Sequence, residues 1–223
     1  MNGIFVTGTD TNVGKTVVSA AFVCALRRGK EKVCYWKPIQ TGIETDDDTQ
    51  TVRELADCAS EEIFDAGFRL ERPLSPHLSA RLANVEITIE KTLAFVQNIK
   101  DEKFWIVEGA GGAFVPLNEN ELMIDLIKQL DLPVVIVARS GLGTINHTLL
   151  TVEVLLNRSV KILGIIMNGE PDEENRKAIE HFGQVKVLAQ MPKFDMPINQ
   201  NLELWAKSNL MSAANLTADK NSK

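Results

Sequence analysis

A phosphate-binding motif lies near the start of the chain. The segment Gly8-Thr9-Asp10-Thr11-Asn12-Val13-Gly14-Lys15-Thr16 follows an apolar run and opens a long helical pattern. In this context glycines let main-chain N–H groups turn toward phosphate oxygens, and the helix N-terminus adds a favourable dipole. Lys15 contributes a mobile positive charge and Thr16 a hydroxyl for Mg²⁺. The pattern predicts a P-loop that binds the phosphates of a nucleoside triphosphate between Thr9 and Thr16; the alternative is a glycine turn with an incidental lysine.

The spacing within this loop is unusual. Five residues separate Gly8 from Gly14, whereas the common G-x-x-x-x-G-K-[ST] pattern has four. A wider loop could admit a second substrate beside the γ-phosphate.

Two charged residues follow later apolar runs. Lys37 follows Val33–Trp36, so it is expected at the same sheet edge as Lys15, where two lysines would converge on one anionic site. On position alone, an ordinary surface lysine is the slightly favoured interpretation. Glu108 follows Phe104–Val107 and precedes a run of glycines too small and flexible to be explained by packing. Its carboxylate could reach Mg²⁺ directly or through water, or could cap the glycine turn.

Three adjacent carboxylates, Asp46, Asp47 and Asp48, precede a helical segment. They could cap the helix and complement its dipole, and only one of them needs to face a metal ion. Asp48, the nearest to the helix, is the candidate ligand.

A glycine-rich segment, Gly141-Leu142-Gly143-Thr144, leads into another helical pattern. The helix N-terminus there is a candidate carboxylate or phosphate site, with a plain helix entry as the alternative. Neither His77 nor His147 has the spaced partners that a metal site or a nucleophilic triad needs, so we assign them no chemistry.

Helical patterns lie between most of six short apolar runs, which predicts a parallel sheet with helices on both faces. The fold class is therefore α/β, a three-layer fold of the P-loop NTPase type with a mostly parallel central sheet. The predicted strands are Ile4–Thr7, Val33–Trp36, Phe104–Val107, Pro133–Ala138, Ile162–Met167 and Val185–Ala189. The predicted helices are Lys15–Arg28, Asp48–Ala59, Thr88–Lys100, Glu121–Leu130, Ile145–Asn157 and Glu173–His181, with a further one expected near the C-terminus.

Composition narrows the function class. With 223 residues, 44% of them hydrophobic, we expect one domain over residues 1–211 and a polar tail, 212–223, that frays. A formal net charge of -6 leaves no basic field for nucleic acid or anionic lipid. The start of the chain lacks a leader pattern, so a cytoplasmic location is expected. Cys24, Cys34 and Cys58 are interpreted as reduced thiols that pack in the fold.

Several segments together resemble the dethiobiotin synthetase family. They are Val6–Thr11 with Val13–Thr16, Lys37-Pro38 with Thr41-Gly42, Ser75-Pro76-His77, Val107–Gly112 and Ile145-Asn146-His147. The long G-x5-G-K-T spacing is itself a feature of that family. The resemblance runs from the first strand to about Pro192. It implies an ATP- and Mg²⁺-dependent ligase of biotin biosynthesis that closes a ureido ring on 7,8-diaminopelargonic acid with CO2, and a homodimer that shares its substrate site.

The resemblance also implies roles for individual residues. The catalytic positions fall on Thr11, Lys15 and Lys37, and the metal positions on Thr16, Asp48 and Glu108. Nucleotide contacts fall on Asn12, Val13, Gly14, Lys15, Thr16, Val17, Asp48, Glu108, Gly109, Ala110, Gly111, Asn168, Gly169, Pro192, Lys193 and Phe194. Substrate contacts fall on Thr41, Gly143, Thr144, Ile145 and Asn146.

Two other classes share the phosphate loop. A partitioning or switch ATPase uses the same fold to act on a protein partner, but its P-loop usually carries an extra early lysine, where this chain has Thr9 and Asp10. A small-molecule kinase is the third possibility. It would be distinguished by phosphate release that does not require both CO2 and a diamine.

Overall fold

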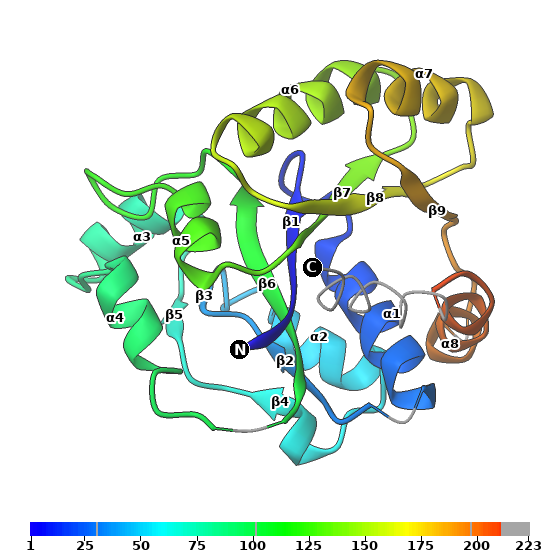
Figure 1. Ribbon diagram of the computed structural model, residues 1–223. Helices are drawn as coiled ribbons and strands as arrows, with labels where there is room; N and C mark the ends of the chain where they lie inside the picture. Colours follow the sequence, from blue (N-terminus) through cyan, green and yellow to red (C-terminus); the bar gives the residue numbers. More distant parts are fainter. Residues whose placement is uncertain (30, 101, 197, 211–223) are drawn as a thin grey trace, which may run out of the picture.

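The computed structural model describes residues 1–29, 31–100, 102–196 and 198–210, and a seven-stranded sheet runs through its centre (Figure 1). The strand order is β4-β2-β6-β1-β7-β8-β9, and every neighbouring pair is parallel. The strands are β1 (Asn2–Gly8), β2 (Val33–Trp36), β4 (Ile63–Phe64), β6 (Phe104–Gly112), β7 (Val134–Arg139), β8 (Ile162–Asn168) and β9 (Val187–Met191). The predicted α/β class and parallel central sheet are confirmed.

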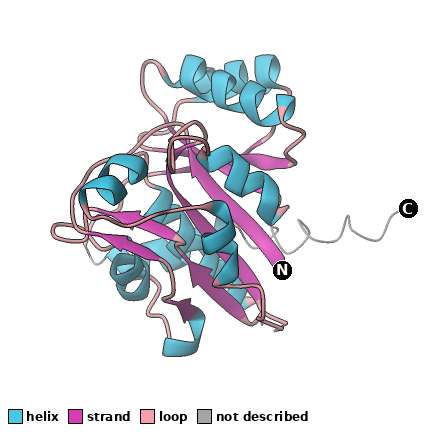
Figure 2. Cartoon of the chain, turned by 90° about the vertical axis from the view of Figure 1, so that its left-hand side faces the viewer, coloured by secondary structure: helices cyan, strands magenta, loops and turns pink. Residues whose placement is uncertain are grey.

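Helices cover both faces of the sheet, as Figure 1 and Figure 2 show from two directions. One face packs against α1 (Lys15–Arg28), α2 (Asp48–Leu55) and α8 (Ile198–Asn209). The other apolar cluster draws on α3 (Pro76–Leu82), α4 (Ile89–Ala94), α5 (Met123–Leu130), α6 (Thr144–Asn157) and α7 (Glu173–Gly183). The three-layer arrangement follows because both faces of a parallel sheet are apolar and must be buried.

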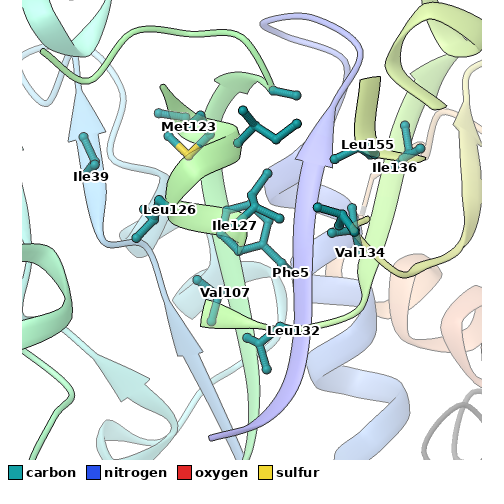
Figure 3. Packing of buried hydrophobic residues seen from close by; sticks show 14 of the residues in the cluster. Phe5, Ile39, Val107, Met123, Leu126, Ile127, Leu132, Val134, Ile136 and Leu155 are labelled. Atoms are coloured by element: carbon teal, nitrogen blue, oxygen red, sulfur yellow. The ribbon is translucent and has the colours of Figure 1, made fainter. Parts of the chain in front are cut away.

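The central strand β1 shows how the two cores are separated. Phe5 belongs to one apolar cluster, while Ile4 and Val6 belong to the other, because successive side chains point to opposite faces. Figure 3 shows Phe5 beside Met123 and Ile127 of α5, all fully or almost fully buried. Burying one such side chain stabilises the fold by about 1.5–3 kcal/mol. This packing holds β1, the strand that leads into the phosphate loop, in place.

Some predicted boundaries were wrong for local reasons. The helix predicted over Asp48–Ala59 ends at Leu55, and Asp57 then takes a left-handed conformation (φ 47°). The helix predicted over Thr88–Lys100 covers only Ile89–Ala94, with the Thr88 side chain accepting a hydrogen bond from the Lys91 N–H.

Two strand boundaries were also wrong. The strand predicted over Val185–Ala189 is Val187–Met191, since Gln184 caps α7 in the left-handed region (φ 50°). The strand predicted to stop at Val107 continues to Gly112, so Glu108 lies inside β6.

Sequence periodicity missed the shortest elements. A second parallel sheet consists of β3 (Ile39–Thr41) and β5 (Phe68–Leu70), and a 3-10 turn, Ser60–Glu62, precedes β4. None of the described helices combines the length and the apolar character needed to cross a bilayer. The predicted polar tail lies outside the described residues, and the division of the chain at residue 211 stays a prediction.

Candidate active site

The phosphate loop is shaped by backbone conformation and by a neighbouring strand. Gly14 caps the N-terminus of α1 with φ 99°, a left-handed conformation that side chains disfavour. A Cβ atom there would collide with the Asn168 amide. That amide nitrogen donates a hydrogen bond to the Val13 carbonyl (2.9 Å), so the end of β8 holds the loop. The contact of Asn168 with a nucleotide base stays a prediction.

Lys15 folds back over its own loop. Its Nζ donates to the Asp10 carbonyl (3.0 Å), and the side chain is almost fully buried. Burial, together with repulsion from Lys37, lowers the pKa of Lys15 to about 8. On the outer side of the loop, Arg139 Nη2 donates to the Thr11 carbonyl and lies 3.1 Å from Asp10 Oδ2.

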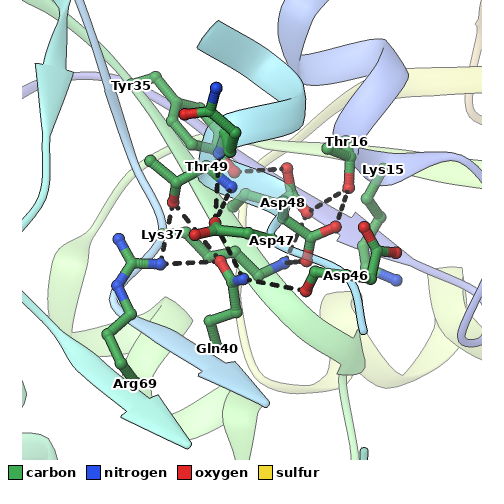
Figure 4. A network of polar contacts seen from close by, with 12 residues as sticks. Lys15, Thr16, Tyr35, Lys37, Gln40, Asp46, Asp47, Asp48, Thr49 and Arg69 are labelled. Atoms are coloured by element: carbon green, nitrogen blue, oxygen red, sulfur yellow. Dashed lines mark hydrogen bonds and ion pairs between the residues drawn. The ribbon is translucent and has the colours of Figure 1, made fainter. Parts of the chain in front are cut away.

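A cluster of opposite charges adjoins the loop (Figure 4). Lys37 Nζ lies 2.5 Å from Asp48 Oδ2 and 2.7 Å from Glu108 Oε1. Thr16 Oγ1 lies 2.7 Å from Asp48 Oδ1 and 3.1 Å from Glu108 Oε1. Lys37 is 3% exposed and Glu108 is 0% exposed, so Lys37 is not an ordinary surface lysine. Lys37 directly follows β2, and Glu108 lies in the adjacent strand β6, so the two side chains meet; Lys15 lines the same cavity as both of them.

The pKa values in this cluster follow from burial and pairing. Burial alone would lower the pKa of Lys37, but Glu108 and Asp48 more than offset this and raise it. Burial alone would raise the pKa of Asp48, but the Lys37 ammonium and the Thr16 hydroxyl hold it below its ordinary value. Lys37 and Asp48 therefore form an ionised pair at neutral pH.

The three adjacent aspartates have different positions. Asp47 caps α2, because its Oδ1 accepts hydrogen bonds from the N–H groups of Thr49 (2.9 Å) and Gln50 (3.2 Å). Asp48, the first residue of the helix, turns toward Lys37. Asp46 lines the cavity beside the cluster, and burial together with Asp48 raises its pKa.

The oxygen atoms of Thr16, Asp48 and Glu108 are suitable ligands for Mg²⁺, but they do not form a complete metal site from protein groups alone. Among the residues that the structure describes, no three His, Cys, Asp or Glu side chains group closely enough to hold a metal ion. Mg²⁺ usually takes only one or two protein carboxylates and completes its shell with water and substrate phosphates. The donor set thus suits an ion that is held jointly with a nucleotide.

A cavity of about 670 Å³ connects these groups. It reaches from the phosphate loop to Thr41, which lies at the end of β3, and to the turn that precedes α3. Its lining comprises Thr11, Asn12, Gly14, Lys15, Thr16, Val17, Lys37, Thr41, Gly42, Thr45, Asp46, Asp48, Thr51, Pro73, Leu74, Ser75, Pro76, Glu108, Ala110, Gly111 and Val115.

Several predicted site residues do not line this cavity. They are Val13, Gly109, Gly143, Thr144, Ile145, Asn146, Asn168, Gly169, Pro192, Lys193 and Phe194. Thr144 Oγ1 donates to the Arg139 carbonyl, Asn146 is exposed at the start of α6, and Phe194 packs edge-on against Trp205. Within one chain, the glycine-rich helix entry therefore does not line the cavity, although Arg139 connects it to the outer side of the phosphate loop.

Packing explains part of the glycine run after Glu108, contrary to our expectation. A Cβ atom at Gly109 would lie 2.9 Å from the Phe5 ring. Gly111 does line the cavity and adopts φ 67°.

Sequence reasoning missed three residues that contact the cluster or its support. The Tyr35 hydroxyl donates to Glu108 Oε2 (2.9 Å), and both side chains are fully buried. Gln40 and Arg69 form hydrogen bonds behind the aspartates. One feature of the sequence could have indicated this network. Gln40 is a polar residue between Ile39 and Thr41, shortly after Lys37-Pro38.

Comparisons with known proteins agree with this architecture. A family model described as "AAA domain" matches residues 2–200. The MinC:MinD cell division complex of Aquifex aeolicus matches with a TM-score of 0.63 and 14% identity over 100% of this chain and 98% of that one. A ParA family ATPase from Chlorobium tepidum gives a TM-score of 0.56 at 13% identity, covering 96% and 92% of the two chains. At these identities the likeness concerns the fold alone.

Sequence relatives are more specific. An ATP-dependent dethiobiotin synthetase of Paramagnetospirillum magneticum is 50% identical over 86% of this chain and 88% of its own length. One from Brucella ovis is 42% identical over 86% of both chains. A biotin biosynthesis bifunctional protein of Bordetella avium is 47% identical over 92% of this chain, which spans only 42% of that protein. The chain belongs to the dethiobiotin synthetase family.

Proposed function

We propose that this protein is an ATP-dependent dethiobiotin synthetase that carboxylates 7,8-diaminopelargonic acid with CO2 and closes the ureido ring. The observation that carries the proposal is one cavity that holds the phosphate loop, the Lys37–Asp48–Glu108 cluster and Thr41. Family membership names the reaction, and the cavity provides adjoining places for a triphosphate and a second substrate. The cytoplasmic location belongs to the same proposal.

The first step forms a carbamate. A neutral amine nitrogen of the substrate attacks the carbon of CO2, a C–N bond forms, and the nitrogen loses a proton to solvent. The product carries a negative charge. Lys37 and Lys15, which line the same cavity, supply the positive charge that stabilises it.

The second step activates the carbamate. A carbamate oxygen attacks the γ-phosphorus of ATP, the bond to the bridging oxygen breaks, and ADP leaves. The phosphate loop and Lys15 hold the phosphates, and Thr11 lies on the rim of the same loop. Thr16, Asp48 and Glu108 would hold Mg²⁺, which neutralises phosphate charge when bound. The second amine then attacks the carbamoyl carbon, the carbon–oxygen bond to phosphate breaks, and the nitrogen loses a proton to solvent, so no nucleophilic side chain is required.

The assay is direct. The protein is incubated with diaminopelargonic acid, labelled bicarbonate, Mg²⁺ and ATP, and acid-stable label is counted. We expect label only when both ATP and the diamine are present. Phosphate release that ignores CO2 and the diamine would instead support a switch ATPase or a kinase.

The depressed pKa of Lys15 gives a calorimetric prediction. The charged form is favoured again beside phosphates, so binding of ATP above pH 8 should take up a proton. With a pKa of about 8 in the free protein, we expect uptake of roughly nine-tenths of a proton per site at pH 9 and about one-tenth at pH 7. Titrations in two buffers with different ionisation enthalpies measure this uptake. Equal uptake at both pH values would argue against Lys15 as its source.

We further propose that the substrate site is shared between two chains of a homodimer. Asn146 is exposed in the first turn of α6, outside its own chain's cavity, and the helix N-terminus there could bind the substrate carboxylate of the partner. A two-fold dimer would create two such composite sites.

Subunit mixing tests the shared site. Lys15→Ala and Asn146→Glu chains should each be inactive alone, because one lacks the phosphate contact and the other repels the carboxylate. After exchange, half of the dimers are mixed and each rebuilds one intact site of two, so activity should recover to roughly a quarter of wild type. Continued inactivity despite demonstrated exchange would show that Asn146 serves its own chain.

A further inference from the structure

A buried polar network lies behind Asp48, on the side away from the phosphate loop (Figure 4). Its centre is Gln40, which is fully buried in β3, three residues after Lys37. Gln40 Nε2 lies 3.1 Å from Asp47 Oδ1 and 3.3 Å from the Asp46 carbonyl, and donates to both. The Gln40 side-chain amide therefore anchors, through these two hydrogen bonds, the residues immediately before α2.

The other end of the amide is held by Arg69. Arg69 Nη1 donates to Gln40 Oε1 (2.7 Å) and to Thr49 Oγ1 (2.9 Å), and Nη2 donates to Asp65 Oδ1 (3.0 Å). Gln40 and Arg69 are also register partners in the small sheet of β3 and β5. Every polar atom of the Gln40 amide is thus engaged, which fixes its orientation.

This arrangement determines where Asp48 lies. Asp47 Oδ1 accepts three N–H groups, from Thr49, Gln50 and Gln40, so the cap of α2 is anchored both within the helix and from β3. Asp48 is the next residue, and it reaches Lys37 and Thr16 from this anchored turn. If this turn lost its support and shifted by about 1 Å, the Asp48 carboxylate would move out of hydrogen-bond range of Lys37 and Thr16.

We propose that Gln40 and Arg69 are positioning residues that hold Asp48 in place for the Mg²⁺–nucleotide complex. The proposal rests on the proposed function, which assigns Asp48 to the metal. Neither residue lines the cavity, so both would act through the N-terminus of α2. Residues that orient metal ligands typically change metal affinity 10- to 100-fold when removed.

The test compares Gln40→Ala with Gln50→Ala. Gln50 is a matched control because it lies exposed in the first turn of the same helix, where its side chain bonds Glu54 (2.7 Å). Binding of a nonhydrolysable ATP analogue is measured in EDTA and across a Mg²⁺ titration. For Gln40→Ala we expect an EDTA affinity within about twofold of wild type and a Mg²⁺ half-saturation raised at least tenfold. Gln50→Ala should match wild type in both measurements.

A second variant covers the case in which Gln40→Ala does not fold. Gln40→Glu keeps the partner for Arg69 but removes the donor to Asp47 and adds a repulsive charge beside it, so it should show the same metal defect. A folded variant with an unchanged Mg²⁺ titration would overturn the proposal, as would an equal loss of affinity with and without Mg²⁺. If the wild type itself ignores Mg²⁺, the proposed metal site fails, and the role of Gln40 fails with it.

Discussion

Replacing Lys15 with alanine is expected to abolish turnover and leave the protein folded. The lysine is the charged element of the phosphate loop, and its ammonium is held at the cavity by the Asp10 carbonyl. Loss of one charge-assisted phosphate contact in the transition state costs on the order of 3 kcal/mol or more, which lowers the rate by at least two orders of magnitude. Label incorporation from bicarbonate measures the loss.

The Lys15→Ala variant should lose activity without losing folding stability. The pKa of Lys15 in the folded protein, about 8, lies below its ordinary value of 10.5, so burying the charged form opposes folding at pH 7. This cost is fully present below pH 8 and disappears as the pH rises toward 10.5. Alanine removes the cost, and the melting temperature at pH 7 should therefore match or exceed that of wild type.

Lys177→Ala is the matched control, since it removes the same charge from the exposed face of α7. It should retain wild-type turnover. Near-normal turnover in Lys15→Ala would contradict the P-loop assignment, and a collapse of its melting temperature would contradict the account of its pKa.

The phosphate loop was predictable because its determinants are local. Glycines, lysine and threonine lie within one segment that joins a strand to a helix, and the conformation of Gly14 follows from its place at the helix cap. Glu108 and Lys37 were predictable as neighbours in outline, since the carboxyl ends of parallel strands share one edge of the sheet. Their strands, β2 and β6, are adjacent in the sheet.

The burial of Lys37 could not be deduced from position. It depends on Glu108, 71 residues away in sequence, and on Asp48 at the start of a helix. The network of Gln40 and Arg69 was hidden for a similar reason. It joins residues 29 positions apart on two strands of three residues each, which are too short to show a period of two. Such contacts depend on tertiary structure, and local patterns carry no signal for them.

Lys37→Gln is expected to lose turnover and also to lower the free energy of unfolding. The ammonium is the shared counterion of Asp48 and Glu108, and Glu108 is fully buried. Removing one partner of a buried ion pair typically costs 3–5 kcal/mol, because the remaining charge has lost its partner. Glutamine can still donate a hydrogen bond, so we expect a loss of about 3 kcal/mol in denaturant unfolding.

Two further measurements on Lys37→Gln separate charge from packing. Mg²⁺ should restore part of the lost stability, because a divalent cation beside the same carboxylates replaces the missing charge. The double variant Lys37→Gln/Glu108→Gln should also be more stable than Lys37→Gln alone, since the uncompensated buried carboxylate is gone, yet it should remain inactive. Nucleotide binding should survive in Lys37→Gln, because the phosphate loop is intact. If stability were unchanged and turnover kept, Lys37 would be neither the counterion of the buried carboxylates nor a catalytic cation.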